Sequence, residues 1–165
     1  MQKKLISIII PLLNEEEILE KCYSQICTAL NNKEKDCDFE FIFMDNFSED
    51  QSFKKLQKIA RKDKRVKVVS LSKNFGYQRS IWTGYKVSKG SAAIVFDCDL
   101  QDPPELLEEF LNFWEKGYKI VYGIRKSRKE GKLINFVRKS FYRVISGISQ
   151  NSLPEDVGDF MLVDR

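Results

Sequence analysis

The 165-residue chain contains no histidine. This absence excludes a Ser-His-Asp triad, a histidine general base and any histidine-ligated metal site. The four cysteines, Cys22, Cys27, Cys37 and Cys98, show no CxxC spacing, so we interpret them as reduced thiols of a cytosolic domain. Any chemistry must therefore rest on carboxylates, amides, cations and a bound metal.

The sequence also lacks a long apolar run. A helix that crosses a bilayer needs about 18 consecutive apolar residues, and the run 5–13 is far shorter. No small-residue cleavage site follows this run, which favours a buried first strand over a signal peptide. The formal net charge of +4 is mild, whereas nucleic-acid binders usually carry a stronger and more clustered excess.

Apolar runs and helix-start signals alternate along the chain. The pattern predicts strands at 5–11, 39–45, 66–71, 92–97, 119–124 and 157–163, and helices that begin at Asn14, at Ser48 or Asp50, at Tyr77 and at Asp102, followed by a long helix at 133–148. This alternation is typical of an α/β fold with a mostly parallel, Rossmann-like sheet flanked by helices. The length suits one domain over residues 1–165.

Polar clusters follow the first four predicted strands. They are Asn14-Glu15, Asp45-Asn46, Asn74 and Asp97-Cys98-Asp99. The carboxyl ends of parallel strands meet at one edge of the sheet, where ligands of such folds bind. We therefore expect these side chains to lie close together in a ligand site.

The most informative cluster is Asp97, Asp99 and Gln101. In an extended chain, residues spaced by two project to the same side, so three oxygen-bearing side chains would converge. Hard oxygen ligands suit Mg²⁺ or Mn²⁺ and leave room for diphosphate oxygens. A lone Asp-x-Asp is equally typical of a polar strand end beside a helix cap, but the neighbouring clusters favour the metal interpretation.

Two further segments are candidates for nucleotide contacts. Asp45 ends the second predicted strand, where a carboxylate can accept hydrogen bonds from a nucleobase or ribose. Pro11 to Glu15 form a stiff turn whose backbone could frame a base. Helix capping also explains part of both patterns, since Ser48, Asp50 and Asn14 are good capping residues.

Five segments, taken together, resemble a known family. They are residues 7–16 (SIIIPLLNEE), 44–50 (MDNFSED), 72–78 (SKNFGYQ), 96–105 (FDCDLQDPPE) and 157–165 (VGDFMLVDR). In this order they resemble the family 2 glycosyltransferases, and most of all the polyprenyl-phosphate branch that includes dolichol-phosphate mannose synthase and the bactoprenol glucosyltransferases. The resemblance implies a glycosyltransferase A-type fold, inversion at the anomeric carbon and a Mg²⁺ or Mn²⁺ cofactor.

The resemblance also assigns roles to residues. It places the metal at Asp97, Asp99 and Gln101, the nucleotide sugar at Pro11, Leu13, Asn14, Glu15, Asp45, Ser48, Asp97, Cys98 and Asp99, catalytic carboxylates at Asp99 and Asp159, and the acceptor phosphate at Arg125 and Arg138. The implied donor is a nucleoside diphosphate sugar, UDP-glucose first and GDP-mannose second, and the implied acceptor is a polyprenyl phosphate.

The chain departs from the family pattern at three positions. The family often has a second Asp at the position of Asn46 and a Gly at that of Phe47, which bears on the choice of base. The closing motif commonly carries Arg at the position of Met161. Relatives usually continue into membrane-spanning helices, so we expect a truncated catalytic domain, itself soluble, from a protein that acts at the cytoplasmic face of a membrane.

The predicted helix at 133–148 has an apolar stripe and a basic face. Such helices can lie on anionic membranes, although packing against the sheet requires the same stripe. Membrane contact through this helix and through further carboxyl-terminal helices is therefore an expectation, and an oligomer is compatible with the sequence. A nucleic-acid partner is not expected, because the basic residues lack interleaved aromatic platforms.

Two other functions remain open. A soluble glycosyltransferase acting on a sugar hydroxyl in cell-surface polysaccharide synthesis would keep the Asp-x-Asp, but would need neither the arginines nor the 101–104 block. A nucleotide-binding or assembly module without turnover would not hydrolyse a sugar nucleotide in the presence of Mn²⁺.

Overall fold

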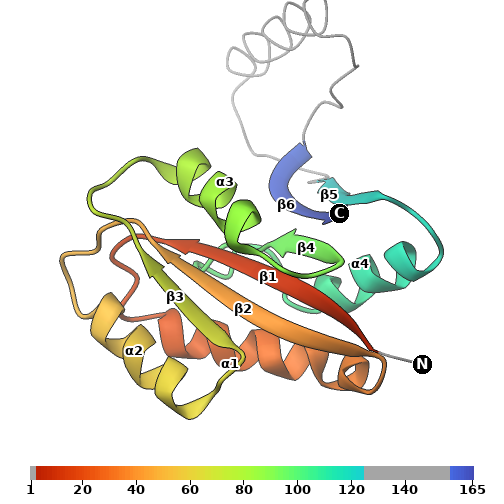
Figure 1. Ribbon diagram of the computed structural model, residues 1–165, viewed down its shortest axis with the longest axis horizontal. Helices are drawn as coiled ribbons and strands as arrows, with labels where there is room; N and C mark the ends of the chain where they lie inside the picture. Colours follow the sequence, from red (N-terminus) through yellow and green to blue (C-terminus); the bar gives the residue numbers. More distant parts are fainter. Residues whose placement is uncertain (1–2, 125–156) are drawn as a thin grey trace, which may run out of the picture. The chain divides into compact units, whose positions relative to one another are not determined.

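The computed structural model describes residues 3–124 and 157–165 (Figure 1). In chain order the elements are β1 (Lys4–Leu12), α1 (Leu19–Leu30), the short 3-10 helix η1 (Asn31–Lys35), β2 (Cys37–Asp45), α2 (Ser52–Lys62), β3 (Val66–Ser70), α3 (Tyr77–Val87), β4 (Ala92–Val95), α4 (Leu106–Glu115), β5 (Ile120–Ile124) and β6 (Val157–Asp164). The chain forms two compact units, Met1–Val121 with Asp159–Arg165, and Tyr122–Gly158. The candidate site lies in the first unit.

The strands form one mostly parallel sheet in the order β3-β2-β1-β4-β6-β5. β1 is central and pairs in parallel with β2 and β4, while β6 returns antiparallel to β4, with Leu162 opposite Ile94. This arrangement confirms the predicted fold class. Within residues 3–124 and 157–165, none of the helices has the length and apolarity required to span a bilayer.

Helices cover both faces of the sheet (Figure 1). Successive side chains of a strand point to opposite faces, and β1 follows this rule. Ile8 and Ile10 pack with residues of α1, α2 and α4 in the larger core, whereas Ile9 packs with Ile81 of α3 in a second core on the other face. Burial on both faces explains why β1 is apolar from Leu5 to Leu12, with Ser7 as the exception.

α3 begins at Tyr77 as predicted, whereas α1, α2 and α4 begin later than the sequence predicts. α1 starts after Ile18, α2 after Gln51 and α4 after Glu105, and none of these three positions makes a side-chain cap hydrogen bond. The prediction that Asn14 caps the first helix is wrong, because Asn14 adopts a left-handed conformation with φ of 55°. Its side chain instead joins two loops of the site. The predicted helix at 133–148 lies outside the described residues.

Candidate active site

The loops that follow β1 and β2 are joined at the carboxyl edge of the sheet. The backbone N–H of Asn14 donates to Ser48 Oγ at 2.9 Å, and Asn14 Oδ1 accepts from the N–H of Glu49 at 2.8 Å. The N–H of Glu15 donates to Ser52 Oγ, also at 2.9 Å. The capping-type residues therefore hold the two loops together, which satisfies backbone donors that no helix satisfies.

Asp45 and Asn46 are buried where β2 ends, with exposed fractions of 1% and 5%. Asp45 Oδ1 accepts from the N–H of Ser48 at 3.1 Å, and Asp45 Oδ2 accepts from Ser70 Oγ at 3.0 Å. Both carboxylate oxygens thus have partners within the protein, so Asp45 fixes the shape of the edge on which Leu13 and Phe47 are exposed.

Asn46 connects this edge to the start of α3. Its Nδ2 donates to Asn74 Oδ1 at 2.8 Å, and its Oδ1 accepts from the N–H of Phe75 at 3.0 Å. Asn74 Oδ1 also accepts from the N–H of Gly76 at 2.9 Å. Gly76 precedes α3 with φ of 89°, a conformation that residues other than glycine rarely adopt. The two amides therefore set where α3 begins.

The expectation that residues 97–101 form extended chain after the strand, with Asp97, Asp99 and Gln101 on one side, is wrong. β4 ends at Val95, the chain turns at 98–99, and Leu100 is left-handed with φ of 58°. Asp99 Oδ1 accepts from the N–H of Gln101 at 3.0 Å, which stabilises the turn. Asp99 and Gln101 are exposed here, while Asp97 is half-buried.

Negative charge accumulates at this edge. Burial raises the pKa of Asp97, and the charges of Asp99 and Asp159 raise it further against the opposing hydrogen bond from Tyr77. Burial also raises the pKa of Glu15, as does the charge of Asp99. Among the described residues, these carboxylates form no ion pair with Lys or Arg. The cluster therefore favours binding of a cation.

Sequence reasoning missed two residues of the site. The Tyr77 hydroxyl donates to Asp97, and Gln78 Nε2 donates to Asp159 Oδ1 and Oδ2 at 3.2 and 3.3 Å. Both belong to the 72–78 segment that carries the family resemblance, which was the available signal. Asp159 lies on β6, so the antiparallel return of this strand brings it to the same edge as Asp97.

The remaining predicted residues are placed differently. Pro11 is buried within β1, opposite Met44. Cys98 is 2% exposed, and its free thiol lies in the same core cluster as Cys22. Arg125 and Arg138 lie outside the described residues.

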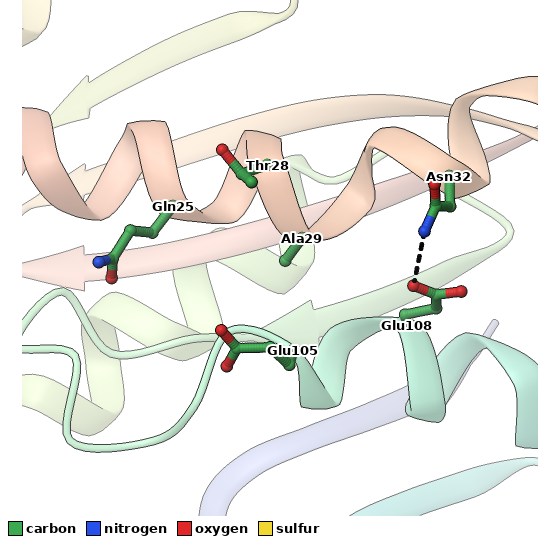
Figure 2. Close-up of a pocket in the computed structure, with 6 residues that line it drawn as sticks. All are labelled: Gln25, Thr28, Ala29, Asn32, Glu105 and Glu108. Carbon is green, nitrogen blue, oxygen red and sulfur yellow. Dashed lines mark hydrogen bonds between the residues drawn. The ribbon is translucent and has the colours of Figure 1, made fainter.

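A cavity of about 420 Å³ lies apart from these residues, between α1 and α4 (Figure 2). It is lined by Gln25, Thr28, Ala29, Asn32, Glu105 and Glu108. Asn32 Nδ2 donates to Glu108 Oε2 at 3.5 Å across it. None of the predicted site residues lines this cavity.

Curated relatives match nearly all of the chain. The uncharacterized glycosyltransferase YkcC of Bacillus subtilis is 37% identical over 163 residues, which cover 96% of this chain and 49% of YkcC. The bactoprenol glucosyl transferase of Shigella phage SfV is 30% identical over 161 residues, covering 97% of this chain and 52% of that protein. The chain therefore spans about half the length of the curated relatives it matches.

Solved glycosyltransferases share the fold. Glucosyl-3-phosphoglycerate synthase from Mycobacterium tuberculosis, in complex with Mn²⁺, UDP and glucosyl-3-phosphoglycerate, superimposes with a TM-score of 0.64 at 19% identity over 98% of this chain and 57% of that one. This likeness confirms the glycosyltransferase A-type fold. The family model for glycosyl transferase family 2 matches residues 7–165, and the chain therefore belongs to that family.

Proposed function

We propose that the chain is the catalytic part of an inverting glycosyltransferase that moves a sugar from a nucleoside diphosphate sugar to a polyprenyl phosphate. The observation that carries the proposal is the acidic sheet edge at which adjacent residues of α3, Tyr77 and Gln78, bond to Asp97 and Asp159. Among the described residues, neither carboxylate forms an ion pair with Lys or Arg. The sequence match to a bactoprenol glucosyl transferase supports the lipid acceptor. We take UDP-glucose as the first donor to test and GDP-mannose as the second.

A divalent cation fits this excess of negative charge. Asp97, Asp99 and Gln101 would hold Mg²⁺ or Mn²⁺, which neutralises the leaving diphosphate when bound. No group of three His, Cys, Asp or Glu side chains in the described part of the chain could hold an ion by itself. A metal site with few protein ligands leaves coordination positions free for the oxygens of the diphosphate.

The loops after β1 and β2 would receive the nucleoside. Their backbone is held by Asn14, Ser48 and buried Asp45, so the exposed edge at Leu13 is preorganised. Because this edge is already rigid, nucleotide binding does not incur the entropic cost of ordering the loops.

The acceptor phosphate oxygen would attack the anomeric carbon from the face opposite the departing diphosphate. A phosphate monoester is already anionic at neutral pH, so the attack needs no strong base, which suits a chain without histidine. Arg125 and Arg138 would pair with that phosphate, because guanidinium groups bind it bidentately. Asp159 would orient the sugar or the acceptor, and would serve as base only for a hydroxyl acceptor.

The same proposal assigns residues 1–165 to one catalytic domain that works at the cytoplasmic face of a membrane. Membrane contact would come from the segment 133–148 and from carboxyl-terminal helices.

Calorimetric titration with UDP and GDP, each with and without Mn²⁺, tests the donor site. Binding of one nucleotide only in the presence of Mn²⁺ is expected, and Asp99→Ala should abolish it. Asp38→Ala removes an exposed carboxylate at the start of β2 and is the matched control. Unchanged affinity in Asp99→Ala would refute the metal assignment.

Transfer of labelled sugar to polyprenyl phosphate by the intact protein tests the acceptor. Transfer to a polysaccharide hydroxyl instead would favour the soluble-glycosyltransferase alternative. Nucleotide binding with neither transfer nor hydrolysis would favour a module without turnover.

A further inference from the structure

The first turn of α3 contacts the acidic edge through two consecutive side chains. Gln78 Nε2 lies 3.2 and 3.3 Å from the two carboxylate oxygens of Asp159, which is 81 residues later in the chain. The adjacent Tyr77 hydroxyl donates to Asp97. One helical turn thus holds a carboxylate from the end of β4 and a carboxylate from β6.

This turn is itself fixed by hydrogen bonds from the segment before it and by close packing further along α3. Asn46 is 5% exposed and its Oδ1 accepts from the N–H of Phe75, while Asn74 Oδ1 accepts from the N–H of Gly76. Further along the helix, Gly84 packs so closely on β1 that an added Cβ would lie 2.4 Å from Ile9 Cγ2. Because α3 is held at its start and again at Gly84, Gln78 presents its amide from a rigid helix.

The chemical type of the contact is informative. Within the described residues, Asp159 forms no ion pair, and its side chain accepts hydrogen bonds from the neutral amide of Gln78. An amide N–H orients a carboxylate without cancelling its charge, whereas Lys or Arg would neutralise it. The contact with Gln78 therefore constrains the direction of the Asp159 carboxylate without pairing it with a cation.

We propose that Gln78 is a positioning residue that holds the Asp159 carboxylate toward the transferred sugar and the acceptor. The inference rests on the proposed glycosyl transfer. It adds that Gln78 is the group that orients Asp159 for this reaction. A misplacement of about 1 Å in such a group can cost about 100-fold in rate.

Gln78→Glu is the decisive variant, because it preserves the shape of the side chain and replaces the donor by an acceptor that repels Asp159. We expect kcat for transfer by the intact protein to fall about tenfold or more, with the KM for the donor unchanged within about twofold. Gln78→Ala should cause a smaller loss, since it removes the hydrogen bond without adding repulsion. Gln57→Glu makes the same change at an exposed position on α2 and should leave kcat unchanged.

A double-mutant cycle separates positioning from a general structural effect. In an Asp159→Asn background, Gln78→Glu should cost less than about twofold, because the carboxylate it repels is gone. An equal loss in both backgrounds would mean that Gln78 acts through another group and would overturn the inference.

The wild-type measurement distinguishes the two levels of the proposal. Transfer by the wild type with an unchanged kcat in Gln78→Glu would overturn the positioning role alone. Failure of the wild type to transfer sugar to polyprenyl phosphate or to a hydroxyl acceptor would overturn the proposed function and this inference with it.

Discussion

The side-chain amides of Asn46 and Asn74 are hydrogen-bonded at 2.8 Å, with Asn46 Nδ2 as the donor. Residue 46 must donate to Asn74 and accept from the N–H of Phe75 at the same time. A carboxylate can only accept. The departure from the Asp that the family often has at this position therefore has a structural cause, because the amide supplies the donor that links β2 to the turn before α3.

Asn46→Asp should destabilise the protein by about 1–3 kcal/mol, because a buried group loses its donor and gains a charge. Urea unfolding followed by circular dichroism measures the change. Asn31→Asp introduces the same charge at an exposed position and should shift the free energy of unfolding by less than about 0.5 kcal/mol. Equal midpoints for the two variants would contradict the role of the hydrogen bond between Asn46 and Asn74.

Gly84→Ala should also destabilise the protein, although alanine in place of glycine usually stabilises a helix by up to about 1 kcal/mol. The reason is steric, since the new Cβ would meet Ile9 Cγ2 at 2.4 Å and Met44 Cγ at 3.3 Å. We expect a net loss of about 1–3 kcal/mol in thermal or urea unfolding. Lys86→Ala, at an exposed position on the same helix, is the control. A Gly84→Ala variant as stable as the wild type would show that α3 can move away from β1.

The strands were predictable from the sequence because each depends on local burial. β1 is buried on both faces and is apolar from Leu5 to Leu12 except at Ser7, and β4 is apolar throughout, from Ala92 to Val95. The gathering of Asn14, Asp45 and Asp97 at one edge followed from parallel topology alone. These features can be predicted from the apolar pattern of each strand and from the rule that the carboxyl ends of parallel strands meet at one edge of the sheet.

The helix starts and the lining of the site could not be predicted in the same way. The sequence around Asn14 is typical of a helix cap, but Asn14 instead donates its backbone N–H to Ser48, which lies in a loop 34 residues later. The contact between Gln78 and Asp159 spans 81 residues and exists only because β6 runs antiparallel to β4. Contacts of this length depend on tertiary packing, which overrides local propensity.

Glu40 should make stability depend on acid pH. Burial raises the pKa of this carboxyl, but hydrogen bonds from Lys67, Ser7 and the N–H of Lys89 outweigh it and lower the pKa below 4.5. A lowered folded-state pKa gives stability that is present above the unfolded pKa and is lost as the pH falls through the folded pKa.

Glu40→Gln should therefore be less stable than the wild type by about 2 kcal/mol at pH 7, and this difference should shrink below pH 4.5. Urea unfolding at pH 7, 5, 4 and 3 measures both curves. Glu17→Gln alters an exposed glutamate and should follow the wild type. A difference that stays constant over this range would show that the Glu40 charge does not stabilise the fold.

Asp164 fixes the strand that carries Asp159. Asp164 Oδ1 accepts from Trp114 Nε1 and Asp164 Oδ2 from Lys119 Nζ, both at 2.6 Å, and Asp164 lies opposite Ala92 in the sheet. Asp164→Ala leaves the indole N–H of Trp114 without its acceptor and loosens the end of β6, five residues beyond Asp159.

We expect Asp164→Ala to lower kcat for sugar transfer by about tenfold, because a loosely held catalytic group spends less time in the productive geometry. Nucleotide affinity should stay unchanged, since the loops after β1 and β2 are held by Asn14 and Ser48. Asp164→Asn keeps an acceptor for Trp114 and should recover part of the rate, while Asp36→Ala, at an exposed position, should have no effect. A parallel loss of nucleotide affinity and kcat would instead mean that β6 supports the whole sheet edge and not Asp159 in particular.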